Sequence, residues 1–497
     1  MKDKRKKMLS NAIIFSASNY IATGLSFISS FVIRKVLGPM LMGLYSELAL
    51  IMSYGLFNHL GMVNAMEREI PFYKGKNDIA KIEKIKKAVF YFVLSSASTI
   101  AVLLIAVSFF GGSLKIGLRF IALAVFLETI GSFYETLLQS YKEFGLWSKL
   151  VVIISIADII LKVFLTIKFG LDGLLTAMAL SALLTIGLYQ LCRGCRIDFR
   201  PKVSFADIKN LFKIGLPLFI FRIMHILYVS IDKLAIIFFL GRLQLGYYSI
   251  ASMVYNYLML LPKFTFRTIY PDFIEHYSRS EDKMATKNYF LAPLRIFSSF
   301  FPLLIGLVII FIPFVVYNIL PRFKEGIFAA QIIAVGAFFY SLIFTAHYLF
   351  IAKGKQKKLS LLYAIGVGIS IILNIVLVKI FDLKINGVAL AMLFSQAVFT
   401  TLLIVCSYRY YSKNFFEHVR LIFSLYIPCF WAVFVLFMLR VFPYGLNPVS
   451  FKKDILDSLL RGAILIFSCA PFVFHIAKRE KLIQIITERF QAQKQAR

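Results

Sequence analysis

The sequence predicts an all-α, polytopic membrane protein, and three observations lead to this prediction. Apolar residues make up 60% of the 497-residue chain and charged residues only 16%, whereas a soluble domain is nearer half apolar and a quarter charged. The apolar residues gather in runs of about 20 or more, the length that crosses roughly 30 Å of hydrocarbon as a helix. The basic residues, which give a formal net charge of +31, stand between these runs. We therefore assign them to the membrane surface and not to nucleic acid.

Fourteen runs are long enough to span a membrane, and no polar stretch between them is long enough for an independent soluble domain. The predicted spans cover residues 9–33, 42–66, 88–110, 117–140, 148–169, 171–192, 211–239, 244–272, 291–319, 327–352, 359–381, 386–407, 420–440 and 457–477. We expect six spans in an N-terminal lobe of residues 1–210 and six in a C-terminal lobe of residues 211–418. The last two helices and the tail form an addition of residues 419–497.

The distribution of Lys and Arg among the loops predicts the orientation of the chain. These residues are concentrated in the two terminal segments and in every second loop, and they are sparse in the loops between. By the positive-inside rule, both termini lie in the cytoplasm and the protein crosses the cell membrane many times.

Two short motifs occur twice and indicate an internal repeat. The pattern Leu-Gly-x4-Gly-x-Tyr-Ser begins at Leu37, after the first span, and again at Leu240, after the seventh. A second pattern, Asp/Asn-Gly-x3-Ala-Met-x2-Ser, begins at Asp172 and at Asn386, in the sixth and twelfth spans. Because six spans separate the members of each pair, the two halves run parallel through the membrane. Parallel repeats are typical of transporters that bind substrate between the halves.

These motifs resemble the polysaccharide and O-antigen flippases, whose superfamily also includes the lipid II flippases and the multidrug and toxic compound extrusion antiporters. The matching residues are Arg34, Leu37, Gly38, Pro39, Gly43 and Tyr45 after span 1, Gly215, Leu216 and Pro217 at the start of span 7, and Asp232 and Lys233 late in span 7. The resemblance covers about residues 8–407. It implies two six-helix lobes around a central cavity that opens alternately to each side. The count of fourteen spans is more similar to the lipid II branch than to the O-antigen flippases.

Ionisable residues inside the predicted spans cost about 2.5–3.5 kcal/mol each unless they face protein or water. In spans 7 and 8 the helical period brings such residues to one face. The predicted substrate-binding residues are Arg222, Lys233, Asn256, Lys263 and Arg267. A cationic wall of this kind suits an anionic ligand, and arginine in particular binds phosphate.

Carboxylates lie at a similar depth in spans 4, 5 and 7. The predicted ion-coupling residues are Glu128, Glu135, Asp158 and Asp232, since intramembrane carboxylates commonly carry a coupling proton or cation. Asp158 and Lys162 are four residues apart and are expected to pair. Two structural alternatives remain open: residues near span ends extend towards the interface, and Asp232 pairs with Lys233 to hold the packing.

The pattern favours a flippase for a polyprenyl-pyrophosphate-linked oligosaccharide, driven by alternating access. A lipid II-type flippase, a cation-coupled multidrug antiporter and a membrane scaffold are the alternatives. The six His show no metal-ligand spacing, and the sequence has no phosphate-binding Gly loop and no nucleophile elbow. We therefore expect no metal, no cofactor and no enzymatic activity. The expected partners are the anionic lipid-linked oligosaccharide, membrane lipids, a polysaccharide polymerase and glycosyltransferases, with no nucleic acid.

Overall fold

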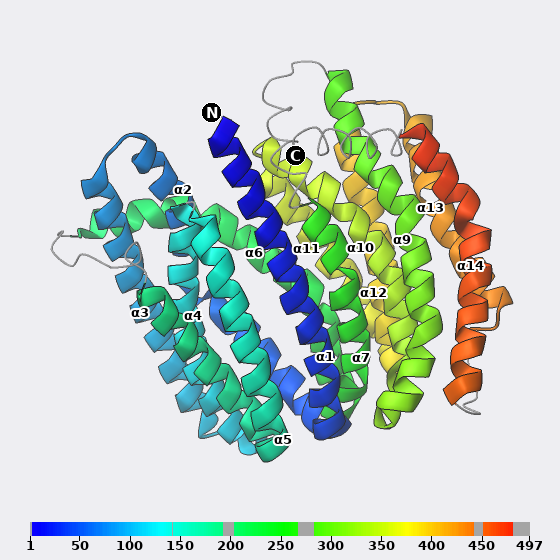
Figure 1. Cartoon of the computed structure of the whole chain (residues 1–497), viewed down its shortest axis with the longest axis horizontal. Coiled ribbons are helices and arrows are strands. Elements are labelled where there is room, and N and C mark those ends of the chain that lie inside the picture. The colour runs from blue at the N-terminus through cyan, green and yellow to red at the C-terminus, as the bar shows by residue number, and fades with distance from the viewer. Residues whose placement is uncertain (1, 142, 192–202, 267–282, 442–450, 481–497) are drawn as a thin grey trace. The chain divides into compact units, whose positions relative to one another are not determined.

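Helices form every regular element among the residues that the computed structural model describes, which are 2–141, 143–191, 203–266, 283–441 and 451–480 (Figure 1). In chain order these are α1 (Lys2–Gly55), η1 (Leu56–His59), α2 (Met62–Gly75), α3 (Ile79–Ser108), η2 (Gly112–Leu114), α4 (Lys115–Ser140), α5 (Phe144–Gln190), α6 (Phe205–Phe239), α7 (Arg242–Leu258), α9 (Lys283–Ile319), η4 (Pro321–Gly326), α10 (Ile327–Ala352), α11 (Gln356–Asn374), η5 (Ile375–Ile380), α12 (Lys384–Tyr408), α13 (Phe415–Met438) and α14 (Phe451–Arg479). Helices satisfy their backbone polar groups internally, which hydrocarbon requires.

In the described part of the chain, eleven helical segments are long and apolar enough to cross a membrane. The chain is therefore an all-α, multi-pass membrane protein, as predicted, whereas the predicted number of fourteen spans is not confirmed. Two features of the structure account for the difference between the fourteen predicted spans and these eleven segments. The long helices α1 and α5 are each interrupted by a residue with non-helical backbone angles, Gly38 and Gly170. In addition, α7 has 17 residues, and the predicted span 244–272 continues past it to residues 267–272, which lie outside the described part of the chain.

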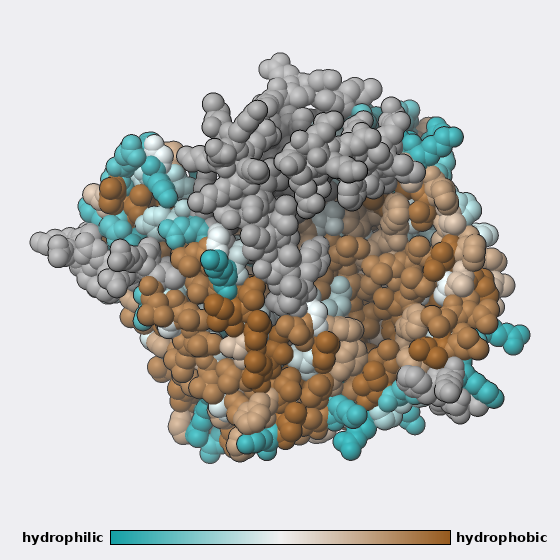
Figure 2. All heavy atoms as spheres, in the orientation of Figure 1, coloured by the Kyte–Doolittle hydropathy of each residue, from teal (hydrophilic) through white to brown (hydrophobic). Residues whose placement is uncertain are grey.

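Large apolar side chains cover the outer faces of the helices. Phe238 on α6 is 86% exposed and Phe467 on α14 is 77% exposed. Figure 2 shows apolar residues gathered along the lengths of the helices, with hydrophilic residues towards their ends. Soluble monomers rarely expose contiguous apolar patches of this extent, so these faces are suited to contact with acyl chains.

The chain divides into two compact units, residues 1–226 and 227–497, and the dividing point lies within α6. In the first unit, α1 packs on α5, and α4 packs on both α3 and α5. In the second unit, α10 is almost entirely buried and packs against α7, α9 and α12. The lobe boundaries predicted from sequence, at residues 210–211 and 418–419, stay predictions.

Within the second unit, helices α13 and α14 pack mainly on α9. The Ser298 hydroxyl on α9 donates a hydrogen bond to the Leu425 carbonyl on α13, at 2.6 Å. Gly306 leaves room on α9 for the Leu465 side chain of α14. The indole N–H of Trp431 joins the pair by donating to the Ser468 carbonyl, at 3.0 Å.

The internal repeat is visible in the backbone. Gly38 has φ 67° and ψ 177°, and the matching Gly241 has φ 83° and ψ −179°. This conformation is essentially restricted to glycine, so the repeated Leu-Gly encodes one unusual turn twice. In the second motif, Gly173 packs against the carbonyl oxygen of Leu165, and Gly387 packs against that of Leu377. A Cβ atom on either glycine would collide with that oxygen.

Candidate functional site

A small polar pocket in the second unit brings three of the predicted site residues together. Its lining includes Asp232 and Lys233 from α6 and Tyr248, Ser252, Tyr255 and Asn256 from α7. Ile333 of α10 and Met392 of α12 contribute apolar surface. The pocket encloses about 300 Å³, counting its open side. Polar groups from two helices thus meet inside a largely apolar unit.

The carboxylate of Asp232 is held from two sides. Its Oδ2 accepts a hydrogen bond from the Tyr248 hydroxyl at 2.9 Å, and its Oδ1 accepts one from the Lys233 backbone N–H at 2.8 Å. Asp232 is only 7% exposed and Tyr248 is fully buried. Tyr248 is the tyrosine of the repeated Gly-x-Tyr motif, so the motif supplies the hydroxyl that fixes this carboxylate. Lys233 and Asn256 remain at the accessible side of the pocket, half-buried and exposed respectively.

A layer of buried tyrosines continues from Tyr255 of this pocket into the second unit, and the sequence analysis did not identify it. The Tyr255 hydroxyl accepts a hydrogen bond from the Gln396 amide of α12, at 3.1 Å. The ring of Tyr340 on α10 contacts the rings of both Tyr255 and Tyr228, with centroids 6.0 and 6.2 Å away. The available signal was Gln396 in the middle of an apolar run, because a buried amide needs a hydrogen-bonding partner.

Two more of the predicted cations, Lys263 and Arg267, follow α7 in the sequence. Lys263 follows α7 and is exposed, and it does not line the pocket. Arg267 lies outside the residues that the structure describes. The substrate-binding role of both stays a prediction.

Arg222 lies on the part of α6 that belongs to the first unit. Its side chain is exposed and interacts electrostatically with His59, which is buried in η1. The Nδ1 atom of His59 accepts a hydrogen bond from the Gly61 N–H, at 3.1 Å. The stripe predicted along span 7 is therefore divided, with Arg222 in the first unit and Asp232 in the second.

The first unit has its own group of charged residues within the membrane-spanning helices. Lys162 forms the predicted pair with Asp158, with Nζ 2.8 Å from Oδ2. Glu128 on α4 interacts electrostatically with both of these α5 side chains. Glu135 is separate from this group and accepts a hydrogen bond from Gln139 at 3.2 Å. Glu128, Asp158 and Lys162 thus place two carboxylates beside one ammonium group.

The described residues contain no group of three or more His, Cys, Asp or Glu arranged to hold a metal ion. The neighbours of the carboxylates described above are the Tyr248 hydroxyl, the Lys162 ammonium and the Gln139 amide.

Comparison with known proteins adds to this geometry. Residues 76–325 match the model of a family described as polysaccharide biosynthesis protein. No curated protein sequence matches the chain.

Solved structures show what fold the chain adopts. It is similar to the lipid II flippase MurJ in an inward closed conformation, with a TM-score of 0.64 and 17% identity over 91% of this chain and 98% of that chain. It is also similar to an inward-facing multidrug resistance MATE family transporter of the MOP superfamily, with a TM-score of 0.61 and 16% identity over 80% of this chain and 94% of that one. A MOP superfamily transporter from Pyrococcus furiosus gives a TM-score of 0.56 and 16% identity, over 80% and 93%. At such identities the likeness establishes the fold, which is that of MOP superfamily transporters.

Proposed function

The chain belongs to the polysaccharide biosynthesis protein family, and on that premise we propose that it is a flippase for a polyprenyl-pyrophosphate-linked oligosaccharide. It carries the head group from the cytoplasmic to the outer leaflet of the cell membrane by alternating access, with both of its termini in the cytoplasm. The lobes are residues 1–210 and 211–418, and residues 419–497 form the added helices and tail. Its partners are the lipid-linked oligosaccharide, membrane lipids, and a polymerase and glycosyltransferases of the same polymer.

The observation that carries the proposal is the polar pocket of the second unit. Lys233 and Asn256 offer a positive charge and an amide at its accessible side. The only carboxylate among the lining residues, Asp232, is held by Tyr248. The ammonium and the amide at the accessible side are hydrogen-bond donors suited to an anion. Arg222, Lys263 and Arg267 supply further positive charge along the path of the phosphates.

Coupling is assigned to the carboxylates inside the membrane. Glu128 and Asp158 place two carboxyl groups beside the single ammonium group of Lys162. An uncompensated charge at this depth is costly, so the group takes up one proton or one monovalent cation. Glu135 and Asp232 are the further coupling positions.

Lipid II transport is the second candidate function. It is favoured by the likeness to the lipid II flippase, which covers a larger share of this chain than the likeness to either transporter. A cation-coupled multidrug antiporter is the third candidate, and the lysine in the pocket argues against it.

Reconstitution into liposomes tests the proposal. Purified protein is given a fluorescent polyprenyl-pyrophosphate oligosaccharide, lipid II, or a cationic dye, and movement between leaflets is measured. We expect transfer of the oligosaccharide, reduced about tenfold or more by Lys233→Gln, since a charge-assisted hydrogen bond contributes roughly 1.5–3 kcal/mol. The matched control is Lys209→Gln, an exposed lysine on the same helix that does not line the pocket. Transfer of lipid II alone or of the dye alone would overturn the proposal in favour of the corresponding alternative.

A further inference from the structure

A second polar pocket lies in the first unit, and none of its lining residues is among those assigned to transport. It is formed by three helices, α2, α3 and α6, and encloses about 460 Å³, counting its open side. Its polar lining residues are Glu69, Tyr73, Lys81, Lys84, Asp207 and Asn210. These residues precede the apolar runs predicted at 88–110 and 211–239, so the pocket lies at the polar ends of α3 and α6.

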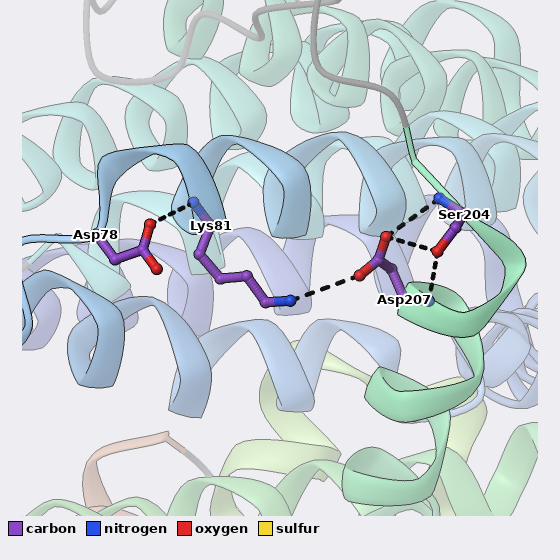
Figure 3. Close-up of polar contacts among 4 residues, drawn as sticks. All are labelled: Asp78, Lys81, Ser204 and Asp207. Atoms are coloured by element: carbon purple, nitrogen blue, oxygen red, sulfur yellow. Dashed lines mark hydrogen bonds and ion pairs between the residues drawn. The ribbon is translucent and has the colours of Figure 1, made fainter.

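The framework of this pocket is a set of contacts between the first turns of α3 and α6 (Figure 3). Asp78 caps α3 by accepting a hydrogen bond from the Lys81 N–H at 2.9 Å. Ser204 donates its hydroxyl to Asp207 Oδ2 at 2.9 Å, and its backbone N–H donates to the same oxygen at 3.1 Å. Lys81 Nζ then reaches Asp207 Oδ1 at 3.5 Å. The two helix ends are thereby held beside each other.

The carboxylates that line the pocket already have partners. Asp207 is bonded to Ser204 and Lys81, and Glu69 lies 3.8 Å from Arg68. Three potential hydrogen-bond donors that line the pocket, in contrast, have no partner in the described part of the chain. Among the described residues, the side chains of Tyr73, Lys84 and Asn210 have neither a hydrogen bond nor an ion pair.

Lys84 is half-buried in the second turn of α3. Its ammonium has no carboxylate partner among the described residues, and a bound anion would supply a negatively charged partner. The pocket thus offers three hydrogen-bond donors from three different helices: an ammonium, a hydroxyl and an amide. A tetrahedral oxyanion can accept hydrogen bonds from all three.

We propose that this pocket binds a phosphate group at the membrane surface, with Lys84, Tyr73 and Asn210 as its ligands and Lys81 as the supporting charge. The phosphate belongs either to a lipid head group or to a phosphorylated solute. The site is separate from the pocket at Asp232 and does not depend on the transport function proposed above.

Binding to the purified full-length protein in detergent tests the site without measuring transport. Two probes are titrated and their Kd values measured: inorganic pyrophosphate, and a short-chain phosphatidylglycerol below its micellar concentration. We expect at least one probe to bind, and Lys84→Gln to weaken it about tenfold, the loss of one charge-assisted hydrogen bond. Asn210→Ala should weaken it several-fold without changing the net charge. Lys76→Gln is the matched control, because this nearby lysine is exposed and does not line the pocket.

The outcomes separate the two sources of phosphate. Binding of phosphatidylglycerol alone identifies a lipid head group, binding of pyrophosphate alone identifies a solute, and binding of both supports the shared chemistry. The proposal is overturned if neither probe binds the wild-type protein in the millimolar range. Equal weakening by Lys84→Gln and Lys76→Gln would also overturn it, because the attraction would then be a property of the whole basic surface.

Discussion

Gly61 and Gly215 lie in backbone contact within the first unit, so that a Cβ atom on either one would collide with the carbonyl oxygen of the other. Gly61 also has a positive φ of 85°, which disfavours any side chain there. One turn further along α6, the ring of Phe219 faces that of Phe57, with centroids 6.4 Å apart. The Gly-Leu-Pro motif at residues 215–217 therefore has a structural reason: it lets α6 approach the turn after α1 closely.

Gly215→Ala should destabilise the protein by about 1–3 kcal/mol, the usual cost of forcing extra volume into a packed contact. Thermal unfolding of the purified protein in detergent measures the effect. Gly187→Ala is the control, because a Cβ at this helical position meets open space. An unchanged Tm for Gly215→Ala would show that the backbone contact contributes nothing to stability.

The two glycines of the repeat should respond alike to substitution. Gly38→Ala and Gly241→Ala each force a side chain into a conformation that costs about 1–3 kcal/mol, and both should lower the Tm to a similar extent. Gly368→Ala, at an open helical position, should leave the Tm unchanged or raise it slightly. A large effect at only one of the repeated glycines would contradict the equivalence of the two turns.

Tyr248→Phe removes the hydrogen bond from Tyr248 to buried Asp232. Since the carboxylate loses a partner while remaining buried, we expect a loss of about 1–3 kcal/mol in unfolding free energy, together with slower transport. Tyr247→Phe is the matched control, because the neighbouring hydroxyl makes no hydrogen bond among the described residues. Equal stability of the two variants would exclude a role for the Tyr248 hydroxyl in fixing Asp232.

Asp158 and Lys162 should show strong energetic coupling. Each single variant, Asp158→Asn or Lys162→Gln, leaves its partner charged inside the membrane, whereas the double variant removes both charges. A double-mutant cycle on unfolding free energy should therefore give a coupling of about 1–3 kcal/mol. The pair Asp457 and Arg461 on α14, also 2.8 Å apart and one turn apart, provides a second cycle for comparison. Zero coupling for the α5 pair would rule out the charge balance proposed for coupling.

Arg222→Ala and Lys263→Ala should each reduce export of surface polysaccharide several-fold in cells that depend on this protein, because each removes a positive charge from the proposed path of the phosphates. Arg322→Ala and Lys168→Ala, at other exposed positions, are the controls. Protein levels in the membrane are measured in parallel. Normal export by both variants at normal levels would remove these two residues from the phosphate path.

The local sequence predicted the features that follow from helical period and from single turns. The spacing of Asp158 and Lys162 predicted an ion pair, and the structure contains it. The repeated Leu-Gly predicted an internal repeat, and the matching residues Gly38 and Gly241 have similar backbone angles. The number of spans could not be predicted from the local sequence in the same way. The helices α1 and α5 each continue past a glycine with non-helical backbone angles, so two predicted spans form one long helical segment.

The sequence by itself determined that this is an apolar, all-helical membrane chain with two related halves, because composition and repeat depend only on the order of residues. Tertiary packing alone decided the partners of the polar groups. The helical period placed Arg222 and Asp232 on one stripe, but α6 passes from one compact unit into the next between them. Tyr248 approaches Asp232, and Lys81 approaches Asp207, through folding of separate helices, a relationship that spacing along one helix does not encode.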